Sequence, residues 1–144
     1  MSPKVSIIIP TYNRADVITR ALNSVLAQTE TNYEVIIVDD ASTDETKQII
    51  ESYLDPRIRY LRHDKNKYAA AARNTGMEKA TGQYIAFLDS DDEWVPTKLH
   101  AQLQIMDSRD DSWGCIYSGA RIYKKSKKKK SITKARKFEN TKRR

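Results

Sequence analysis

Three clusters of polar residues follow apolar runs along this 144-residue chain, and they hold the side chains best suited to chemistry. The clusters are Thr11-Tyr12-Asn13, Asp39-Asp40 and Asp89-Ser90-Asp91. A single arginine, Arg73, stands in an alanine-rich segment between the second and third clusters. Carboxylates bind cations or N–H groups, a guanidinium binds phosphate, and a tyrosine ring stacks on a base.

Asp89-Ser90-Asp91 is the first candidate metal site. Alternate residues at a strand end can lean into one crevice and present two carboxylates. Mg²⁺ and Mn²⁺ prefer oxygen ligands and bridge readily to phosphate oxygens, so this pair would suit a metal that neutralises a diphosphate leaving group. The alternative is an ordinary polar loop or helix cap.

The other two clusters and Arg73 leave similar alternatives open. One acid of Asp39-Asp40 could accept from a base N–H or a ribose hydroxyl while its neighbour caps a helix beginning near Ser42. Arg73 suits phosphate or base contacts, or is simply an exposed helical arginine. Tyr12 could stack on a base or only pack.

The histidines and the cysteine carry little chemistry in this sequence. His63 and His100 have no carboxylate or cysteine companions at metal-ligand spacing, so we expect surface or packing roles. Cys115 is the only cysteine, which excludes a disulfide framework within the chain and a cysteine-rich zinc site. Its apolar surroundings predict a core residue.

Strands and helices alternate along the chain. Apolar runs predict two buried strands, one at 5–9 that Pro10 ends and one at 35–38, and a third apolar strand at 84–88. A more polar run predicts an edge strand at 57–62. The last run predicts a final strand at 115–123. Apolar residues at helical spacing predict helices over 17–26, over 42–54 behind a Ser42–Glu45 capping box, and over 96–106 with Pro96 first. Strong helix formers predict another helix over 69–79, ended by Gly82.

This alternation predicts an α/β fold with a mainly parallel sheet and helices on both faces. Ligands of such sheets bind outside the carboxyl ends of the strands. The three polar clusters all follow strands, so we expect them to converge on one rim. The site would then be built from distant parts of the chain.

Charge divides the sequence into two parts. The net charge is +7, but residues 124–144 hold 12 basic residues and one acidic residue, a net +11, so residues 1–123 carry −4. We predict one domain over 1–123 and a solvated, disordered basic tail over 124–144, with attraction to anionic lipid or nucleic-acid phosphate as the alternatives. No apolar run approaches the ~20 residues of a membrane span, and the start has no signal-peptide pattern.

Four segments together resemble family 2 glycosyltransferases in order and spacing. They are VSIIIPTYN (5–13), EVIIVDDASTD (34–44), AARNTG (71–76) and YIAFLDSDD (84–92). The resemblance covers about 3–123 and implies the nucleotide-sugar-binding part of a GT-A fold, a Rossmann-like three-layer sandwich. It also implies inverting transfer of a sugar from a nucleoside diphosphate, most often UDP, to a saccharide or lipid-linked acceptor, as in polysaccharide biosynthesis.

The resemblance also implies roles for single residues. Thr11 and Tyr12, with Pro10 and Asn13 beside them, would line the nucleoside pocket, and Asp39 would contact the base next to Asp40. Arg73 would lie near the nucleotide, with Asp89 and Ser90 near the ribose or the metal. Asp91 would coordinate Mg²⁺ or Mn²⁺.

The match stops after Tyr123, where the family adds an acceptor-binding half with a carboxylate base. We therefore expect a chain truncated after the metal-motif region, with no catalytic base of its own. The alternative is an inactive nucleotide-sugar-binding module that needs a partner or a second half. A receiver-like phosphoryl-transfer domain would explain Asp39-Asp40 but gives no reason for Arg73 and Asp89-Ser90-Asp91 together. The expected location is cytoplasmic, with peripheral contact to the inner face of the membrane through the tail, and nucleic acid is not an expected partner.

Overall fold

The computed structural model of the chain describes residues 2–110, 113–120, 122–124 and 131–133. The chain divides into two units, residues 1–101 and 102–144. The first unit holds four strands and three helices, and α4 (Lys98–Asp107) begins in it and continues into the second. The strands are β1 (Val5–Thr11), β2 (Tyr33–Asp39), β3 (Ile58–Arg62) and β4 (Tyr84–Phe87), and the helices are α1 (Ile18–Leu26), α2 (Thr46–Glu51) and α3 (Tyr68–Lys79).

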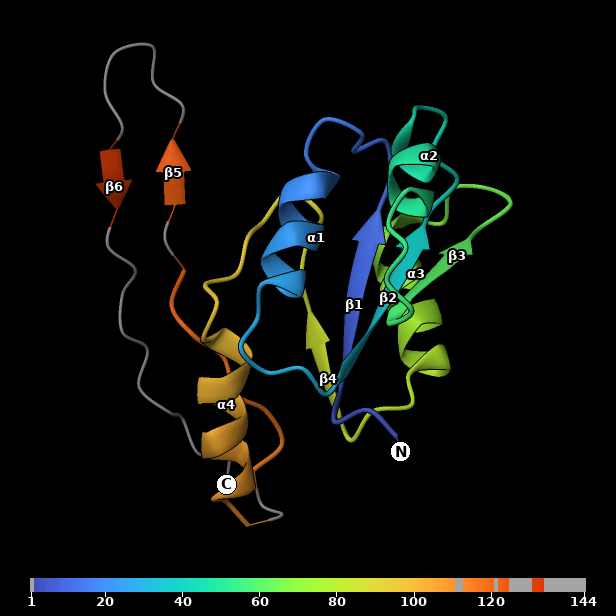
Figure 1. Ribbon diagram of the computed structural model, residues 1–144. Helices are drawn as coiled ribbons and strands as arrows, with labels where there is room; N and C mark the ends of the chain where they lie inside the picture. Colours follow the sequence, from blue (N-terminus) through green and yellow to red (C-terminus); the bar gives the residue numbers. More distant parts are fainter. Residues whose placement is uncertain (1, 111–112, 121, 125–130, 134–144) are drawn as a thin grey trace. The chain divides into compact units, whose positions relative to one another are not determined.

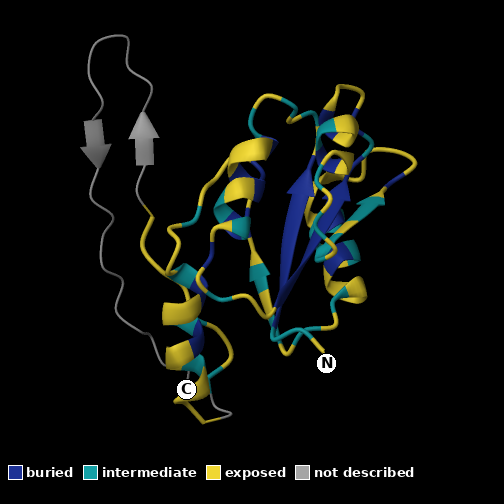
Figure 2. Cartoon of the chain, in the orientation of Figure 1, coloured by how far each residue is buried: buried dark blue, intermediate teal, exposed yellow. Residues whose placement is uncertain are grey.

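The four strands form one parallel sheet in the order β3-β2-β1-β4 (Figure 1). Strands β1 and β2 lie at its centre, and every residue of both is buried (Figure 2). Their β-branched runs suit a strand covered on both faces. The predicted parallel α/β sheet is confirmed, and the predicted edge position of β3 is confirmed with it.

Helices cover both faces of the sheet. Tyr33, which pairs with Val5, donates its hydroxyl to the Val25 carbonyl of α1 at 3.0 Å, and α2 packs beside α1. Ile8 points to the opposite face, because side chains alternate along a strand. On that face Gly76 of α3 packs so closely on Ile8 that an added Cβ would lie 2.5 Å from its Cγ2. The result is three layers.

Strand β1 continues through Pro10 to Thr11, whereas the sequence predicts that Pro10 ends it. The reason lies in the pairing. The Ile8 carbonyl accepts a hydrogen bond from Leu88 N, on the β4 side of the strand. The backbone nitrogen of Pro10, two residues further on, faces that same side. Paired residues of β4 end at Phe87, opposite Ile8, so the missing N–H of Pro10 removes no ladder bond.

Helix α2 is shorter than predicted, and its capping box is absent. Ser42 and Glu45 do not cap it through their side chains; instead Asp44 Oδ1 accepts from Thr46 N at 3.0 Å. The Ser42 hydroxyl accepts from Asn13 N across the rim of the sheet. The helix ends at Glu51, and Leu54, predicted to continue it, is exposed.

Three further expectations differ from the structure. Helix α3 ends at Lys79 without help from Gly82, which instead lies against the backbone of β1. Helix α4 starts two residues after Pro96. The third apolar run forms an edge strand whose Ile85 and Phe87 are 44% and 45% exposed. An edge position leaves these side chains without a neighbouring strand.

The second unit contains the end of α4 and an antiparallel pair, β5 (Ile122–Lys124) with β6 (Ser131–Thr133). The final strand predicted over 115–123 is therefore mostly wrong: residues 113–120 have no regular structure, and Cys115 is exposed where a core residue was expected. The predicted disordered tail lies mainly outside the described residues and stays a prediction. Within the described ranges, no helix has the length and apolarity needed to cross a bilayer.

Candidate functional site

A cavity of about 370 Å³ opens at the carboxyl-terminal edge of the sheet. Its size falls within the range of small-ligand sites. The end of β1, the residues following β2 and β4, and the start of α3 contribute to its wall. The lining residues are Pro10, Thr11, Tyr12, Arg14, Asp40, Asn66, Tyr68, Ala69, Ala72, Arg73, Asp89, Ser90 and Asp91.

The structure brings eight of the ten predicted site residues to this one wall. They are Pro10, Thr11, Tyr12, Asp40, Arg73, Asp89, Ser90 and Asp91. They come from three separate strand ends and from α3, so the prediction that distant clusters converge on one rim is confirmed. Asn13 and Asp39 do not line the cavity.

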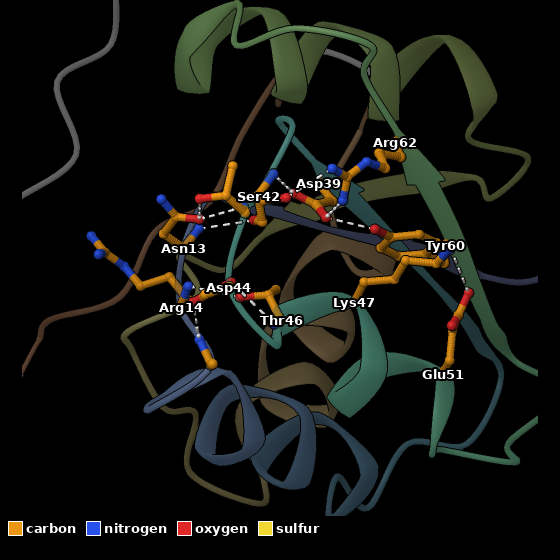
Figure 3. Close-up of polar contacts among 12 residues, drawn as sticks. Asn13, Arg14, Asp39, Ser42, Asp44, Thr46, Lys47, Glu51, Tyr60 and Arg62 are labelled. Atoms are coloured by element: carbon orange, nitrogen blue, oxygen red, sulfur yellow. Dashed lines mark hydrogen bonds and ion pairs between the residues drawn. The ribbon is translucent and has the colours of Figure 1, made fainter.

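Asp39 is fully buried, and its carboxylate is already occupied (Figure 3). Oδ1 accepts from Ser42 N at 2.8 Å, while Oδ2 accepts from the Tyr60 hydroxyl at 2.5 Å and from Arg62 Nη1 at 3.1 Å. Burial and the hydrogen bond to Asp39 raise the pKa of Tyr60 to about 12. The geometry assigns Asp39 to holding β2, β3 and the following loop together, and gives no support to the expected base contact.

Asn13 also holds backbone instead of facing the cavity. Its φ of 50° is left-handed, a conformation that asparagine tolerates better than most residues. Its N–H donates to Ser42 Oγ at 2.9 Å, and its Oδ1 accepts from Thr43 N at 2.8 Å (Figure 3). Asn13 therefore ties the loop after β1 to the loop after β2.

Asp40 lines the cavity and also anchors the start of α3. Its Oδ1 lies 2.7 Å from Nδ1 of the buried His63, and both carboxylate oxygens accept from Lys67 N at 2.8 and 3.0 Å. The other ring nitrogen of His63 lies 2.9 Å from the hydroxyl of Thr75 in α3. Burial alone would raise the pKa of Asp40, but these hydrogen bonds outweigh it and lower the pKa, so the carboxylate is charged.

Asp89 and Asp91 face two arginines. Arg73 Nη2 donates to Asp89 Oδ1, and Arg14 Nη2 lies 3.8 Å from Asp91 Oδ2. Each carboxylate keeps one oxygen without a partner among the residues that the structure describes. Burial, together with the charges of Asp91 and Asp89, raises the pKa of the adjacent Asp92, which shows how closely negative charge is grouped here.

The carboxylates of Asp89 and Asp91 are the candidate ligands for a divalent metal. Over the described ranges, no three His, Cys, Asp or Glu side chains form a metal-binding group. Two carboxylates with free oxygens beside a cavity nevertheless fit Mg²⁺ or Mn²⁺, because these ions take most of their remaining ligands from substrate phosphates and water. The residues fit a metal that arrives with a phosphate ligand.

Thr11 carries the clearest unmet hydrogen bond in the wall. Its side chain is buried, and its Oγ1 has no hydrogen-bond partner within the described part of the chain. A buried hydroxyl without a partner costs stability, so native sites seldom keep one without a reason. A ligand with a donor or acceptor at this position would satisfy it.

Sequence reasoning missed several residues that line the cavity or hold its wall in place. Arg14, Asn66, Tyr68, Ala69 and Ala72 line the cavity, and His63 positions Asp40. Arg14 directly follows the Thr11-Tyr12-Asn13 cluster in the sequence, so it could have been predicted together with that cluster. His63 gave no local signal, because its carboxylate partner lies 23 residues away.

Comparison with known proteins shows which family the chain belongs to. The family model "Glycosyl transferase family 2" matches residues 6–144. The chain belongs to this family. It is 49% identical over 104 residues to the Escherichia coli UDP-Glc:alpha-D-GlcNAc-diphosphoundecaprenol beta-1,3-glucosyltransferase WfaP. The aligned region covers 72% of this chain and 41% of WfaP. It is 45% identical over 102 residues to E. coli WfgD, whose name gives the same reaction, covering 71% of this chain and 40% of WfgD.

Solved structures of GT-A glycosyltransferases have the same fold as this family 2 chain. The crystal structure of S. aureus TarS 1-349 in complex with UDP-GlcNAc matches with a TM-score of 0.70 at 35% identity, over 72% of this chain and 31% of that one. The mannosyltransferase PcManGT from Pyrobaculum calidifontis, in complex with GDP-Man and Mn²⁺, matches with a TM-score of 0.60 at 32% identity, over 65% and 29%. The chain spans less than half the length of the curated relatives it matches.

Proposed function

We propose that the cavity binds a nucleoside-diphosphate sugar, with UDP as the nucleotide, and that the parent activity is transfer of the sugar to a saccharide or lipid-linked acceptor with inversion. One observation carries the proposal: in a family 2 chain, three carboxylates, two arginines and two exposed tyrosines share the wall of a cavity at the carboxyl-terminal edge of a parallel sheet. The names of WfaP and WfgD, and the UDP-GlcNAc in the TarS crystal, support the nucleotide.

Four residues of the cavity wall would contact the donor. Tyr12 would pack on the base and Thr11 Oγ1 would find its missing partner on the nucleoside. Arg73 and Arg14 would contact the diphosphate, where negative charge grows as the sugar leaves. Their present partners, Asp89 and Asp91, would then be free to hold a cation.

Asp89 and Asp91 would hold Mn²⁺ or Mg²⁺. When bound, such an ion supplies positive charge that stabilises a diphosphate leaving group. The Mn²⁺ in the complex of PcManGT supports this assignment. Asp40 would stay with His63 and Lys67 and fix the α3 side of the pocket.

A second candidate is a donor-binding module without turnover of its own. The observation behind it is the distribution of acids: the carboxylates in the cavity wall are Asp40, Asp89 and Asp91, and each has a structural or donor-side task. Inverting displacement needs a base within reach of the acceptor hydroxyl on the face opposite the leaving group. In this version the base would come from another chain or segment.

Calorimetry with UDP and Mn²⁺ tests the donor site. We expect saturable binding that Mn²⁺ strengthens, and no binding would refute both candidates. Hydrolysis and transfer assays with UDP-glucose and UDP-GlcNAc then separate the two. Turnover by the chain alone supports the enzyme, whereas binding without turnover supports the module.

A further inference from the structure

Tyr68, the first residue of α3, has a backbone conformation that aromatic residues rarely adopt. Its φ is 68°, in the left-handed region. A side chain with a Cβ is strained there, and glycine adopts this region freely. Strained residues persist where the surrounding structure enforces them, and they cluster at ligand sites. Tyr68 lines the cavity described above.

Hydrogen bonds hold the backbone on both sides of this strained residue. Asn66 Oδ1 accepts from Tyr68 N at 3.0 Å, and Asp40 accepts from Lys67 N with both carboxylate oxygens. Asp40 is itself fixed by the buried His63. The conformation of Tyr68 is therefore set by the framework and does not come from its own side chain.

The Tyr68 side chain contributes little to the folded protein itself. It is 79% exposed, and among the described residues its hydroxyl has no hydrogen-bond partner. Glycine at this position would remove the strain and lose almost no packing. A second exposed ring, that of Tyr12, lines the same cavity from the end of β1 and is 43% exposed.

We infer that Tyr68 is a ligand-binding residue of the donor pocket, where its ring packs on the flat face of the donor's nucleoside base. This inference rests on the proposed function. Aromatic rings bind bases well because every base has an apolar π-face, and the pocket already has Tyr12 for the same purpose. The strain at Tyr68 then has a reason: it keeps a ring at the wall of the cavity where glycine would leave none.

Calorimetry and thermal unfolding of the wild type and three variants test the inference, with UDP and Mn²⁺ as the ligand. We expect Tyr68→Gly to raise Tm by about 2–5 °C, because the strain is relieved. The same variant should bind UDP about tenfold more weakly, because one stacking contact is lost. Tyr68→Phe, which restores the ring, should restore both wild-type values. Tyr117→Gly is a matched control, since Tyr117 is also exposed but does not line the cavity.

Inorganic pyrophosphate with Mn²⁺ separates base packing from a general effect on α3. Pyrophosphate has no base, so its affinity should be equal in wild type and Tyr68→Gly. An equal loss for UDP and pyrophosphate would overturn the inference and assign Tyr68 to shaping α3. Unchanged UDP affinity in Tyr68→Gly would overturn it as well while leaving the proposed function standing. If the wild-type chain binds no UDP, the proposed function fails and this inference fails with it.

Discussion

Asp91 is the residue at which metal dependence can be tested most directly. It lines the cavity, and one of its carboxylate oxygens lies near Arg14 while the other has no partner in the described part of the chain. We expect Asp91→Ala to weaken Mn²⁺-dependent UDP binding by about tenfold or more, since a metal ligand is lost. The fold should stay intact, because the side chain is exposed.

Glu93→Ala is the matched control for that experiment. Glu93 is an equally exposed acid two residues away, and it pairs with Arg20 at 3.4 Å without lining the cavity. Calorimetry with and without Mn²⁺ should separate the two variants. Equal Mn²⁺ dependence in Asp91→Ala and wild type would refute the metal assignment.

Glu34 governs a different property, the stability of the fold in acid. Burial by itself would raise its pKa, but hydrogen bonds from Ser6, from both donors of Thr81 and from Arg59 lower the pKa from 4.5 to about 2. A group whose pKa is depressed by folding stabilises the protein above its unfolded pKa and loses that contribution as the pH falls. Over this shift the contribution is about 3 kcal/mol.

We therefore expect the free energy of unfolding to fall between pH 4.5 and pH 2, and Glu34→Gln to remove this part of the pH dependence. Urea unfolding at several pH values measures it. An unchanged slope in Glu34→Gln would show that other groups carry the acid sensitivity.

The acid pair after β2 shows what single residues in the sequence could and could not predict. The residue pattern identified Asp39-Asp40 as a functional pair, and the family resemblance assigned the base contact to Asp39, whereas in the structure Asp40 lines the cavity. Neighbouring residues at a strand end point in opposite directions, so an error of one residue exchanges their roles. Here Tyr60 and Arg62, from a strand about 20 residues further on, donate hydrogen bonds to the Asp39 carboxylate. Asp40 remains at the cavity wall.

At the level of elements, the close contact of Gly82 with β1 gives a sharp prediction. A Cβ at this position would lie 2.6 Å from Ser6 N and 2.8 Å from the Val5 carbonyl carbon. Backbone atoms inside a sheet cannot move aside cheaply, so Gly82→Ala should destabilise the protein by about 1–3 kcal/mol. Gly114→Ala, where nothing lies within 4 Å of the added Cβ, should change stability by less than about 0.5 kcal/mol. Thermal unfolding of both variants checks this, and equal Tm values would contradict it.

The elements themselves were largely predictable, and the exceptions depend on contacts distant in sequence. Apolar runs located β1, β2 and β4, helical spacing located α1, and a run of strong helix formers located α3. The runs could not reveal that β4 lies at an edge with half of its side chains exposed, because strand order is set by pairing between distant residues. The capping box predicted from Ser42 and Glu45 is absent for a similar reason. The Ser42 hydroxyl accepts a hydrogen bond from the backbone N–H of Asn13, which lies 29 residues earlier in the sequence.

At the scale of the whole chain, the separation of charge gives a prediction about surfaces. Residues 124–144 carry +11, whereas the rest carries −4. We propose that this segment attracts anionic lipid, each basic residue adding about 1 kcal/mol near such a membrane. The chain should sediment with phosphatidylglycerol vesicles at low salt and be released at about 0.5 M NaCl, where charges are screened.

Replacing Lys127, Lys128, Lys129 and Lys130 with glutamine should weaken vesicle binding by at least about tenfold. The variant should bind UDP as wild type does, since the residues that line the described cavity all fall between positions 10 and 91. Vesicles of neutral phosphatidylcholine serve as the control membrane. Equal binding to both kinds of vesicle would refute an electrostatic attachment.

The register of the sheet has a consequence for synthesis of the protein. Strand β1 pairs with β4 from Val5 opposite Tyr84, so its second neighbour lies roughly 80 residues further along the chain. At translation rates of about 5–20 residues per second, β1 leaves the ribosome roughly 4–16 s before β4 exists. During that interval a strand that is buried along its whole length in the finished sheet has one unpaired edge and incomplete cover. Pairing with β2, which is made first, would cover one edge of β1 during those seconds. Yields of soluble protein should therefore respond to the speed of translation between α1 and β4.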